Sequence, residues 1–159
     1  MEEIRIIELQ EQATAGVRQI ARMDELTTLF DSKFAEVAEA LQASRVTPAG
    51  APYARYRGRP TDTVDVEIGF PVTEAFPPTG GLVVDALPAV RAVETFHVGS
   101  YDKLRETYQR IESWVAEHEL QTLEESWEIY ESGPESDPDP TTWRTRILWP
   151  LTGPQVEKA

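Results

Sequence analysis

The 159-residue chain contains no cysteine and only two histidines, His97 and His118. Without cysteine it has no disulfide, no thiol nucleophile and no thiolate ligand for a metal. Two histidines are too few for a His-rich metal site, so we expect no bound metal. The chain also lacks a P-loop, a G-x-G-x-x-G fingerprint and a G-x-S-x-G elbow, and we expect no cofactor.

Long apolar runs and a signal peptide are missing as well. No run of about 18 apolar residues occurs, and the first residues, Met1-Glu2-Glu3-Ile4-Arg5, have no basic region followed by an apolar core. The sequence therefore predicts a cytoplasmic protein without a membrane partner.

Positive charge is scarce. The chain has 15 Lys and Arg residues against 28 Asp and Glu, a formal net charge of −13 at pH 7. Such a field repels the phosphates of nucleic acid, so we expect no direct nucleic-acid partner. It also enriches cations near the surface, which favours cationic ligands, although an acidic surface kept for solubility explains the same charge.

The length and the 40% hydrophobic content fit one globular domain. We expect that domain over residues 1–152 and a flexible tail over 153–159. The oligomeric state stays open between a monomer and a homodimer.

Helical spacing and alternation divide the chain into two helices and several strands. The first helix is expected to begin at Asp24, as N-cap, and the second at Ser100. Their apolar stripes are Leu26, Phe30, Phe34, Val37 and Leu41, and then Leu104, Tyr108, Ile111 and Val115 with Trp114 beside them. Strands are expected over residues 4–9, 14–20, 53–56, 63–72, 82–87, 89–98, 127–134 and 143–151.

The order strand, helix, strand, strand occurs twice, before and after the Pro- and Gly-rich residues 77–81. The matching motifs are Tyr53-x-x-Tyr56 with Ile68-x-Phe70-Pro71-Val72, and Trp127-x-x-Tyr130 with Ile147-x-Trp149-Pro150-Leu151. The duplication predicts an α+β fold of two repeats, about 1–76 and 82–152. The repeats would form a pseudo-two-fold antiparallel sheet with both long helices on one face and a central ligand cleft.

Glu128 stands between aromatic residues in the expected strand Trp127-Glu128-Ile129-Tyr130. Glu128 and Tyr130 share one face of that strand, and Trp127 and Ile129 share the other. The carboxylate either lies on a solvated face or lines a pocket for a flat cation. Ala54 occupies the matching position of the first repeat, and this asymmetry favours a binding role for Glu128.

Several motifs, most of them in the second half, are shared with a known family. They are His97-Val98-Gly99-Ser100-Tyr101-Asp102-x-Leu104, Tyr108, Trp114, Trp127-Glu128-Ile129-Tyr130, Pro134 and Ile147-x-Trp149-Pro150. With these motifs the chain resembles the GyrI-like (gyrase-inhibitor-like) domain, which is also the effector-binding domain of many bacterial multidrug-responsive transcription activators. The resemblance covers Ile4 to Leu151 and is looser in the first half.

The resemblance implies eight antiparallel strands, two helices and a cleft for lipophilic, often cationic compounds beside a buried glutamate, which is Glu128 here. It also implies an aromatic wall, to which we assign Tyr130, Tyr53, Tyr56, Phe70, Trp149 and Trp127. The activators' DNA-binding region has no counterpart in this sequence.

The function expected on this basis is stand-alone binding of lipophilic, cationic aromatic small molecules, for sequestration or for sensing with a possible protein partner. One alternative is a hydrolase of reactive electrophiles, in which Glu128 is the catalytic residue and acts as general base. A second alternative is a protein-interaction module of the gyrase-inhibitor kind.

Other charged residues are expected to be structural. Arg55, Arg57 and Arg59 fit a solvated hairpin better than an anion site. Asp65 and Glu67 are expected to pair with Arg144 and Arg146 across equivalent sheet faces. His97 is expected to fix the turn between strand and helix.

Overall fold

The computed structural model describes residues 3–58, 61–76, 81–100, 103–132 and 138–152. The expected tail at 153–159, Arg59, Pro134 and the pair Tyr101-Asp102 lie outside these residues. The chain forms two compact units, which we name by their helices. The α1 unit is Gln10–Ala89, and the α2 unit joins Met1–Leu9 to Val90–Ala159.

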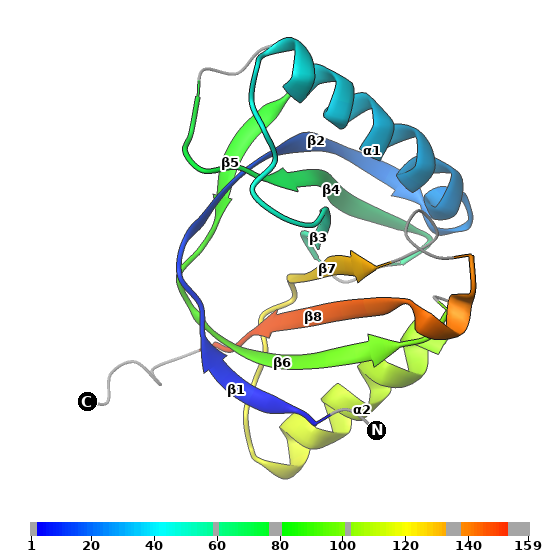
Figure 1. The fold of residues 1–159 in the computed structure, drawn as a ribbon. Helices are drawn as coiled ribbons and strands as arrows, with labels where there is room; N and C mark the ends of the chain where they lie inside the picture. The colour runs from blue at the N-terminus through cyan, green and yellow to red at the C-terminus, as the bar shows by residue number, and fades with distance from the viewer. Residues whose placement is uncertain (1–2, 59–60, 77–80, 101–102, 133–137, 153–159) are drawn as a thin grey trace. The chain divides into compact units, whose positions relative to one another are not determined.

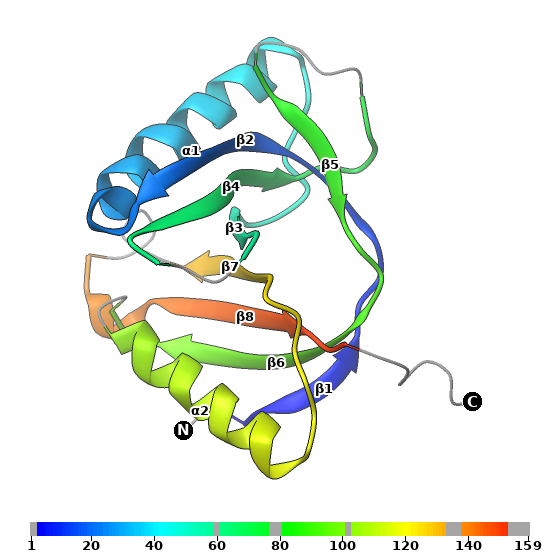
Figure 2. The ribbon, with the colours of Figure 1, turned by 180° about the vertical axis from the view of Figure 1, so that it is seen from behind.

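The α1 unit contains one long helix and a sheet of four antiparallel strands among its described residues (Figure 1). In chain order they are β2 (Gln12–Arg22), a 3-10 turn (Met23–Glu25), α1 (Leu26–Ala43), β3 (Tyr53–Tyr56), β4 (Thr63–Pro71) and β5 (Val83–Leu87). The strand order is β3-β4-β2-β5. Helix α1 lies along β2 and β4 (Figure 2).

The α2 unit has the same composition among its described residues. Its elements are β1 (Arg5–Glu8), β6 (Arg91–Val98), α2 (Leu104–Glu117), β7 (Ser126–Ser132), a 3-10 turn (Pro140–Thr142) and β8 (Arg144–Pro150). The strand order is β1-β6-β8-β7, and all neighbouring strands are antiparallel. The fold is therefore α+β, with eight antiparallel strands and two long helices among the described residues, as expected.

The internal repeat is visible in the order of the elements. Strand, helix, strand, strand is β2-α1-β3-β4 in one unit and β6-α2-β7-β8 in the other. The flanking strands are exchanged relative to the expected repeats 1–76 and 82–152, because β1 pairs with β6 and β5 pairs with β2. Hydrophobic pattern marks a strand but not its partner, so the sequence does not show this exchange.

Each helix fully buries the C-terminal part of the apolar stripe that the sequence predicts, and the earlier stripe residues are half-buried. Val37 and Leu41 of α1 are fully buried against Ala15, Val72 and Leu82. Ile111 and Val115 of α2 pack in the same way on residues of β6 and β8, namely Val93, Ile147 and Trp149. No described helix is long and apolar enough to cross a membrane.

The expected helix caps are wrong. Asp24 accepts a hydrogen bond from Arg22 Nη2 at 2.8 Å, and α1 begins after it, with Glu25 at the cap position and no side-chain cap. Lys103, not Ser100, occupies the cap position of α2, again without a side-chain hydrogen bond. The cap of α1 therefore lies one residue after the expected position, behind a 3-10 turn, and the cap of α2 lies three residues after it; cap preferences of single residues do not reveal such shifts.

Two facing glycines let β2 and β4 approach closely. Gly16 and Gly69 are register partners, and a Cβ on Gly69 would lie 2.1 Å from the carbonyl oxygen of Ala15. A Cβ on Gly16 would lie 2.3 Å from the carbonyl oxygen of Ile68. Only glycine fits at these two paired positions, because a Cβ on either residue would overlap backbone atoms of the neighbouring strand.

Candidate functional site

Strand β7 directs Glu128 and Tyr130 toward helix α2. Glu128 is the register partner of Ile147, which packs on Ile111 of α2, so the carboxylate lies on the helix-facing side of the sheet. Glu128 is only 3% exposed and Tyr130 only 8%. The predicted sharing of one strand face by these two residues is confirmed, and the solvated alternative for Glu128 is wrong.

Two tyrosine hydroxyls hold the Glu128 carboxylate. Tyr130 donates to Oε1 at 2.6 Å, and Tyr108 of α2 donates to Oε2 at 2.7 Å. Both donors are uncharged, so these two bonds orient the carboxylate without cancelling its negative charge. The sequence identified Tyr108 only as part of the apolar stripe; a hydroxyl on the buried face of a helix was the available signal.

Trp149 of β8 completes the aromatic surroundings of this carboxylate. Its ring meets that of Tyr108 edge-on, with 5.7 Å between centroids, and its Nε1 donates to the carbonyl of Leu123 at 2.6 Å. The indole is therefore fixed at both its apolar and its polar end. We name Glu128, Tyr130, Tyr108 and Trp149 the glutamate site.

Trp127 does not join the glutamate site. It is 1% exposed, but its register partner is Leu148, which places it on the face opposite Glu128. Strand alternation alone predicts this separation, since neighbouring residues of a strand point to opposite faces.

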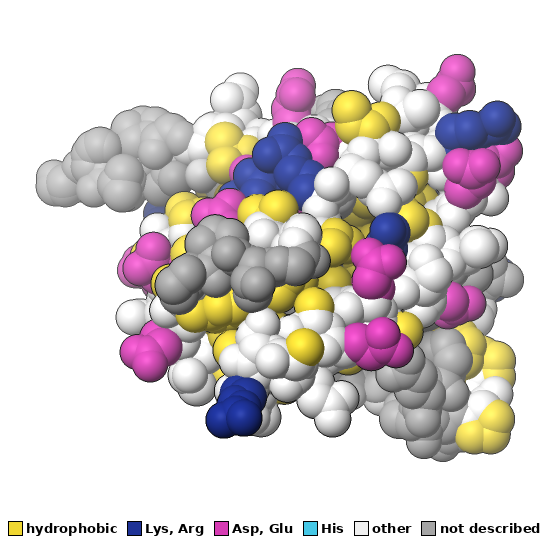
Figure 3. Space-filling view, turned by 90° about the horizontal axis from the view of Figure 1, so that it is seen from above, with side chains coloured by type: hydrophobic (Ala, Val, Ile, Leu, Met, Phe, Trp, Pro, Cys, Tyr) yellow, Lys and Arg dark blue, Asp and Glu magenta, His cyan; other side chains and the backbone are white. Residues whose placement is uncertain are grey.

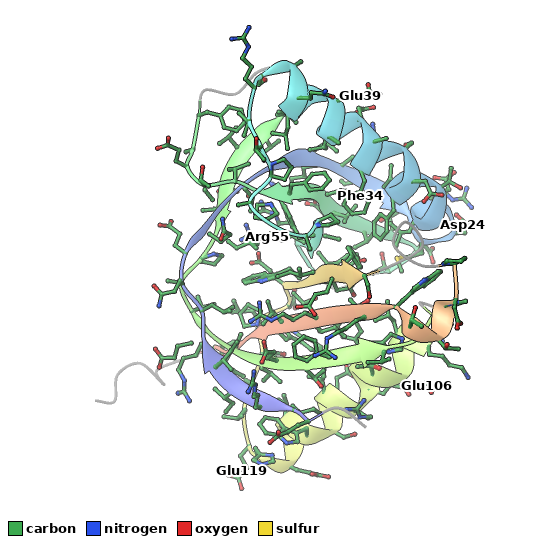
Figure 4. All side chains as sticks on the ribbon, viewed as in Figure 1. Asp24, Phe34, Glu39, Arg55, Glu106 and Glu119 are labelled. Atoms are coloured by element: carbon green, nitrogen blue, oxygen red, sulfur yellow. The ribbon has the colours of Figure 1, made fainter. Side chains whose placement is uncertain are left out.

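The remaining aromatic candidates belong to the α1 unit. Phe70 lies on the face that packs on α1, where its ring centroid is 6.1 Å from that of Phe34, a residue of α1 labelled in Figure 4. Tyr56 shares the strand face of Ala54, whereas Tyr53 lies on the other face with Arg55. Tyr53 and Phe70 therefore point to opposite sides of their sheet.

Glu67 of β4 is a fully buried carboxylate, and it does not pair with Arg144 or Arg146 as expected. It accepts hydrogen bonds from the Tyr53 hydroxyl and from Arg57 Nη2. Burial and the nearby negative charge of Glu67 raise the pKa of Tyr53, which keeps this hydroxyl protonated as a donor.

The expected ion pairs with Arg144 and Arg146 are also wrong. Asp65 bonds to Arg18 Nη2 at 2.7 Å, and Arg144 Nε bonds to Glu131 at 3.0 Å. Arg146 Nε instead donates to Glu94. In each case the partner lies on the neighbouring strand of the sheet. The sequence does not show which strands are neighbours, so it could not predict these partners.

Glu94 is a second buried carboxylate of the α2 unit, on the face opposite the glutamate site. Arg5 Nε donates to its Oε1 at 2.7 Å and Arg146 Nε to its Oε2 at 2.5 Å. Burial acts to raise the pKa of Glu94, but the hydrogen bonds from the two arginines hold it below the ordinary 4.5. These two donors are cations that neutralise the carboxylate.

His97 has the structural role that the sequence predicts. Its Nδ1 lies 2.7 Å from Thr107 Oγ1 of α2, and its Nε2 lies 2.7 Å from the carbonyl oxygen of Ser100. The imidazole thus ties the end of β6 to the start of α2. Among the described residues, no group of three His, Cys, Asp or Glu side chains is placed to hold a metal.

The face shown in Figure 3 carries no single continuous patch of acidic side chains. Asp and Glu side chains are interspersed there with Lys and Arg side chains, and several lie next to one another. On this face, a cation attracted by the net charge of −13 therefore meets individual carboxylates that lie beside basic groups.

The fold, the repeat and the buried glutamate under α2 agree with a match to a family model. The model of the GyrI-like small molecule binding domain matches residues 2–152. The chain belongs to the GyrI-like family. A search of curated proteins finds no match.

Solved structures similar to this GyrI-like chain include EcmrR and SAV2435. The C-terminal domain of EcmrR is 21% identical with a TM-score of 0.84, and the match covers 96% of this chain and 98% of that one. Against EcmrR in its complex with DNA, identity is 22% and the TM-score is 0.85; the match covers 94% of this chain but only 57% of EcmrR.

SAV2435 bound to tetraphenylphosphonium is 11% identical, with a TM-score of 0.70 over 98% of both chains. A hydrolase from Listeria innocua is 14% identical, with a TM-score of 0.65 over 94% of this chain and 92% of that one. At these identities the likeness shows the shared fold, and the family model identifies a small-molecule-binding domain.

Proposed function

We propose that this GyrI-like domain binds lipophilic aromatic cations at the glutamate site, with the Glu128 carboxylate as counter-charge. The observation that carries the proposal is a carboxylate 3% exposed, oriented by Tyr108 and Tyr130. A delocalised cation is only weakly hydrated, so it loses little on entering such a site and gains a charge interaction that burial strengthens.

The aromatic neighbours supply the rest of the affinity. The rings of Tyr108 and Trp149 meet edge-on and offer π-faces to a flat or phenyl-bearing ligand. SAV2435, which shares the fold, was solved with tetraphenylphosphonium bound, and this supports a ligand of the same class here. Binding of this kind serves sequestration of such compounds or their sensing.

Glu128→Gln is the variant that tests this proposal. It keeps the shape of the side chain and removes its charge, so affinity for tetraphenylphosphonium should fall about ten- to a hundredfold, or ~1.5–3 kcal/mol. Affinity for neutral triphenylphosphine oxide should change little, since stacking on the rings remains. Isothermal titration calorimetry measures both affinities.

Glu94→Gln is the matched control, because it removes an equally buried carboxylate of the same unit from the opposite sheet face. It should leave both affinities unchanged at temperatures where the variant is folded. An equal loss of the phosphonium and the phosphine oxide in Glu128→Gln, or an equal loss of phosphonium in both variants, would overturn the assignment of Glu128.

Hydrolysis of an electrophilic ligand is a second candidate, favoured by the way the two tyrosines orient the carboxylate. Glu128 would take a proton from water while the water oxygen attacks a strained-ring carbon. For an epoxide, the ring C–O bond breaks as the new C–O bond forms, and the alkoxide that leaves takes up the proton held by Glu128, which gives a diol.

An aryl epoxide such as styrene oxide separates the two candidates. If the domain is a hydrolase, the chain converts the epoxide to its diol and Glu128→Gln binds it without turnover. Absence of turnover by the native chain, with phosphonium binding intact, rules out this epoxide chemistry and leaves the binding proposal in place.

A further inference from the structure

The two units share the packing of side chains under their helices as well as the order of their elements. Phe34 of α1 (Figure 4) meets Phe70 of β4 edge-on, with 6.1 Å between ring centroids and 69° between ring planes. Tyr108 of α2 meets Trp149 of β8 in the same way, at 5.7 Å and 70°. Side chains on the helix-facing side of one sheet therefore have counterparts in the other unit.

Polar residues of the α2 unit stand at positions that are apolar in the α1 unit. The register identifies equivalent positions, because Val66 lies opposite Tyr56 just as Thr145 lies opposite Tyr130. On the helix-facing sides, the differences include Tyr108 for Phe34, Glu128 for Ala54, Thr95 for Val17 and Thr145 for Val66.

The hydroxyl of Thr145 differs from the other polar groups in this set. The Tyr108 hydroxyl donates to Glu128 at 2.7 Å, and Thr95 Oγ1 donates to the Glu3 carbonyl oxygen at 3.0 Å. Thr145 is 0% exposed, and its Oγ1 has no hydrogen-bond partner among the described residues. The partners of the other groups explain their presence, and that of Thr145 needs another reason.

The unpaired hydroxyl lowers stability in a way that a valine would not. His97 faces Thr145 from β6, but its Nδ1 and Nε2 each lie 2.7 Å from a different oxygen, on Thr107 and Ser100. A buried hydroxyl without a partner destabilises the folded state. Valine has nearly the same shape, and Val66 is itself 0% exposed at the equivalent position. A threonine at 145 therefore indicates a role outside folding.

Thr145 lies on the same sheet face as the glutamate site. Glu128 is the register partner of Ile147, and Thr145 precedes Ile147 by two residues, so its side chain points to the face of Glu128 and Trp149. Glu128 and Thr145 are thus diagonal neighbours of an antiparallel pair, which usually lie about 7–8 Å apart. One aromatic ligand is large enough to contact both groups.

We propose that Thr145 is a specificity-determining residue of the glutamate site, which selects aromatic cations that carry an ether or carbonyl oxygen. The Thr145 hydroxyl would donate a hydrogen bond to that oxygen, while Glu128 remains the counter-charge. This inference rests on the proposed binding of aromatic cations at Glu128 and narrows their chemical class. The hydroxyl that destabilises the free protein then contributes to affinity.

Matched phosphonium ligands test this contact. (Methoxyphenyl)triphenylphosphonium and (ethylphenyl)triphenylphosphonium have the same charge and nearly the same shape, but only the first has an acceptor oxygen. Isothermal titration calorimetry on the ortho, meta and para isomers gives the preference for methoxy over ethyl in the native chain and in Thr145→Val. For at least one isomer, Thr145→Val should reduce this preference about three- to tenfold, the range expected of one neutral hydrogen bond. Tetraphenylphosphonium affinity should stay within about twofold.

Thr95→Val is the matched control. Thr95 is also 0% exposed and lies opposite Ile147 on the same sheet face, but its hydroxyl already has a partner in Glu3. The variant should leave the preference for methoxy unchanged. In urea unfolding without ligand, Thr95→Val should lower stability, whereas Thr145→Val should maintain or raise it, because only Thr95→Val loses a hydrogen bond.

The proposal is overturned if Thr145→Val leaves the preference unchanged for every isomer, or if Thr95→Val reduces it equally. It is also overturned if Thr145→Val destabilises the unliganded protein as much as Thr95→Val, because the Thr145 hydroxyl then has a partner in the folded chain. Tetraphenylphosphonium has no acceptor oxygen, so its weaker binding to Glu128→Gln tests the counter-charge independently of Thr145. Failure of the Thr145 contact is thus distinguishable from failure of the proposed function.

Discussion

Gly69→Ala is expected to destabilise the protein by about 3 kcal/mol or to prevent folding. The added Cβ would lie 2.1 Å from the Ala15 carbonyl oxygen and 2.6 Å from Gly16 Cα. Both atoms belong to the backbone of β2, so no side-chain rotation relieves the overlap. The two strands must separate instead, at the cost of neighbouring ladder hydrogen bonds.

Gly58→Ala is the matched control, because a Cβ there meets nothing within 4 Å. We expect its free energy of unfolding to stay within about 0.5 kcal/mol of the native value. Urea unfolding followed by circular dichroism measures both variants. A Gly69→Ala protein as stable as Gly58→Ala would mean that β2 and β4 do not approach each other as closely at Gly16 and Gly69 as described.

Glu94→Gln is expected to destabilise the protein by about 2–3 kcal/mol at pH 7. The variant loses the charge that Arg5 and Arg146 contact at 2.7 and 2.5 Å. Arg5 is 59% exposed and is rehydrated in the variant, which keeps the loss below that of a fully buried pair.

The effect of Glu94→Gln depends on pH. The pKa of Glu94 is lowered in the folded protein, so its contribution to stability is fully present above the ordinary value of 4.5 and is lost as pH falls through the folded value. Urea titrations between pH 7 and pH 3 should therefore show the two proteins converging in stability below about pH 4. A difference that stays constant over this range would refute the role of charge.

The features that depend on local pattern were predictable from the sequence. The strand expected over residues 127–130 placed Glu128 and Tyr130 on one face and Trp127 on the other, because successive side chains of a strand point to opposite faces of the sheet. Helical spacing identified the buried faces of α1 and α2. The repeat was readable because the motifs around Tyr53 and Trp127 recur at the same place in each module.

Features that depend on which strands are neighbours were not predictable. The exchange of β1 and β5, the partners of Glu67, Asp65 and Arg146, and the Gly16–Gly69 contact all require the register of nonlocal strands. Tyr108 reaches Glu128 because α2 packs on β6 and β8 beside β7, so the sequence could mark its hydroxyl as unusual on a buried helix face but could not name its partner.

The most direct test of the glutamate site is a crystal structure of the chain with tetraphenylphosphonium. We expect the phosphorus within about 6 Å of a Glu128 carboxylate oxygen and of the Tyr108 or Trp149 ring, the range over which a cation interacts with an aromatic face. A phosphonium bound elsewhere, with the Glu128 carboxylate remote from it, would contradict the assignment of Glu128 as the counter-charge.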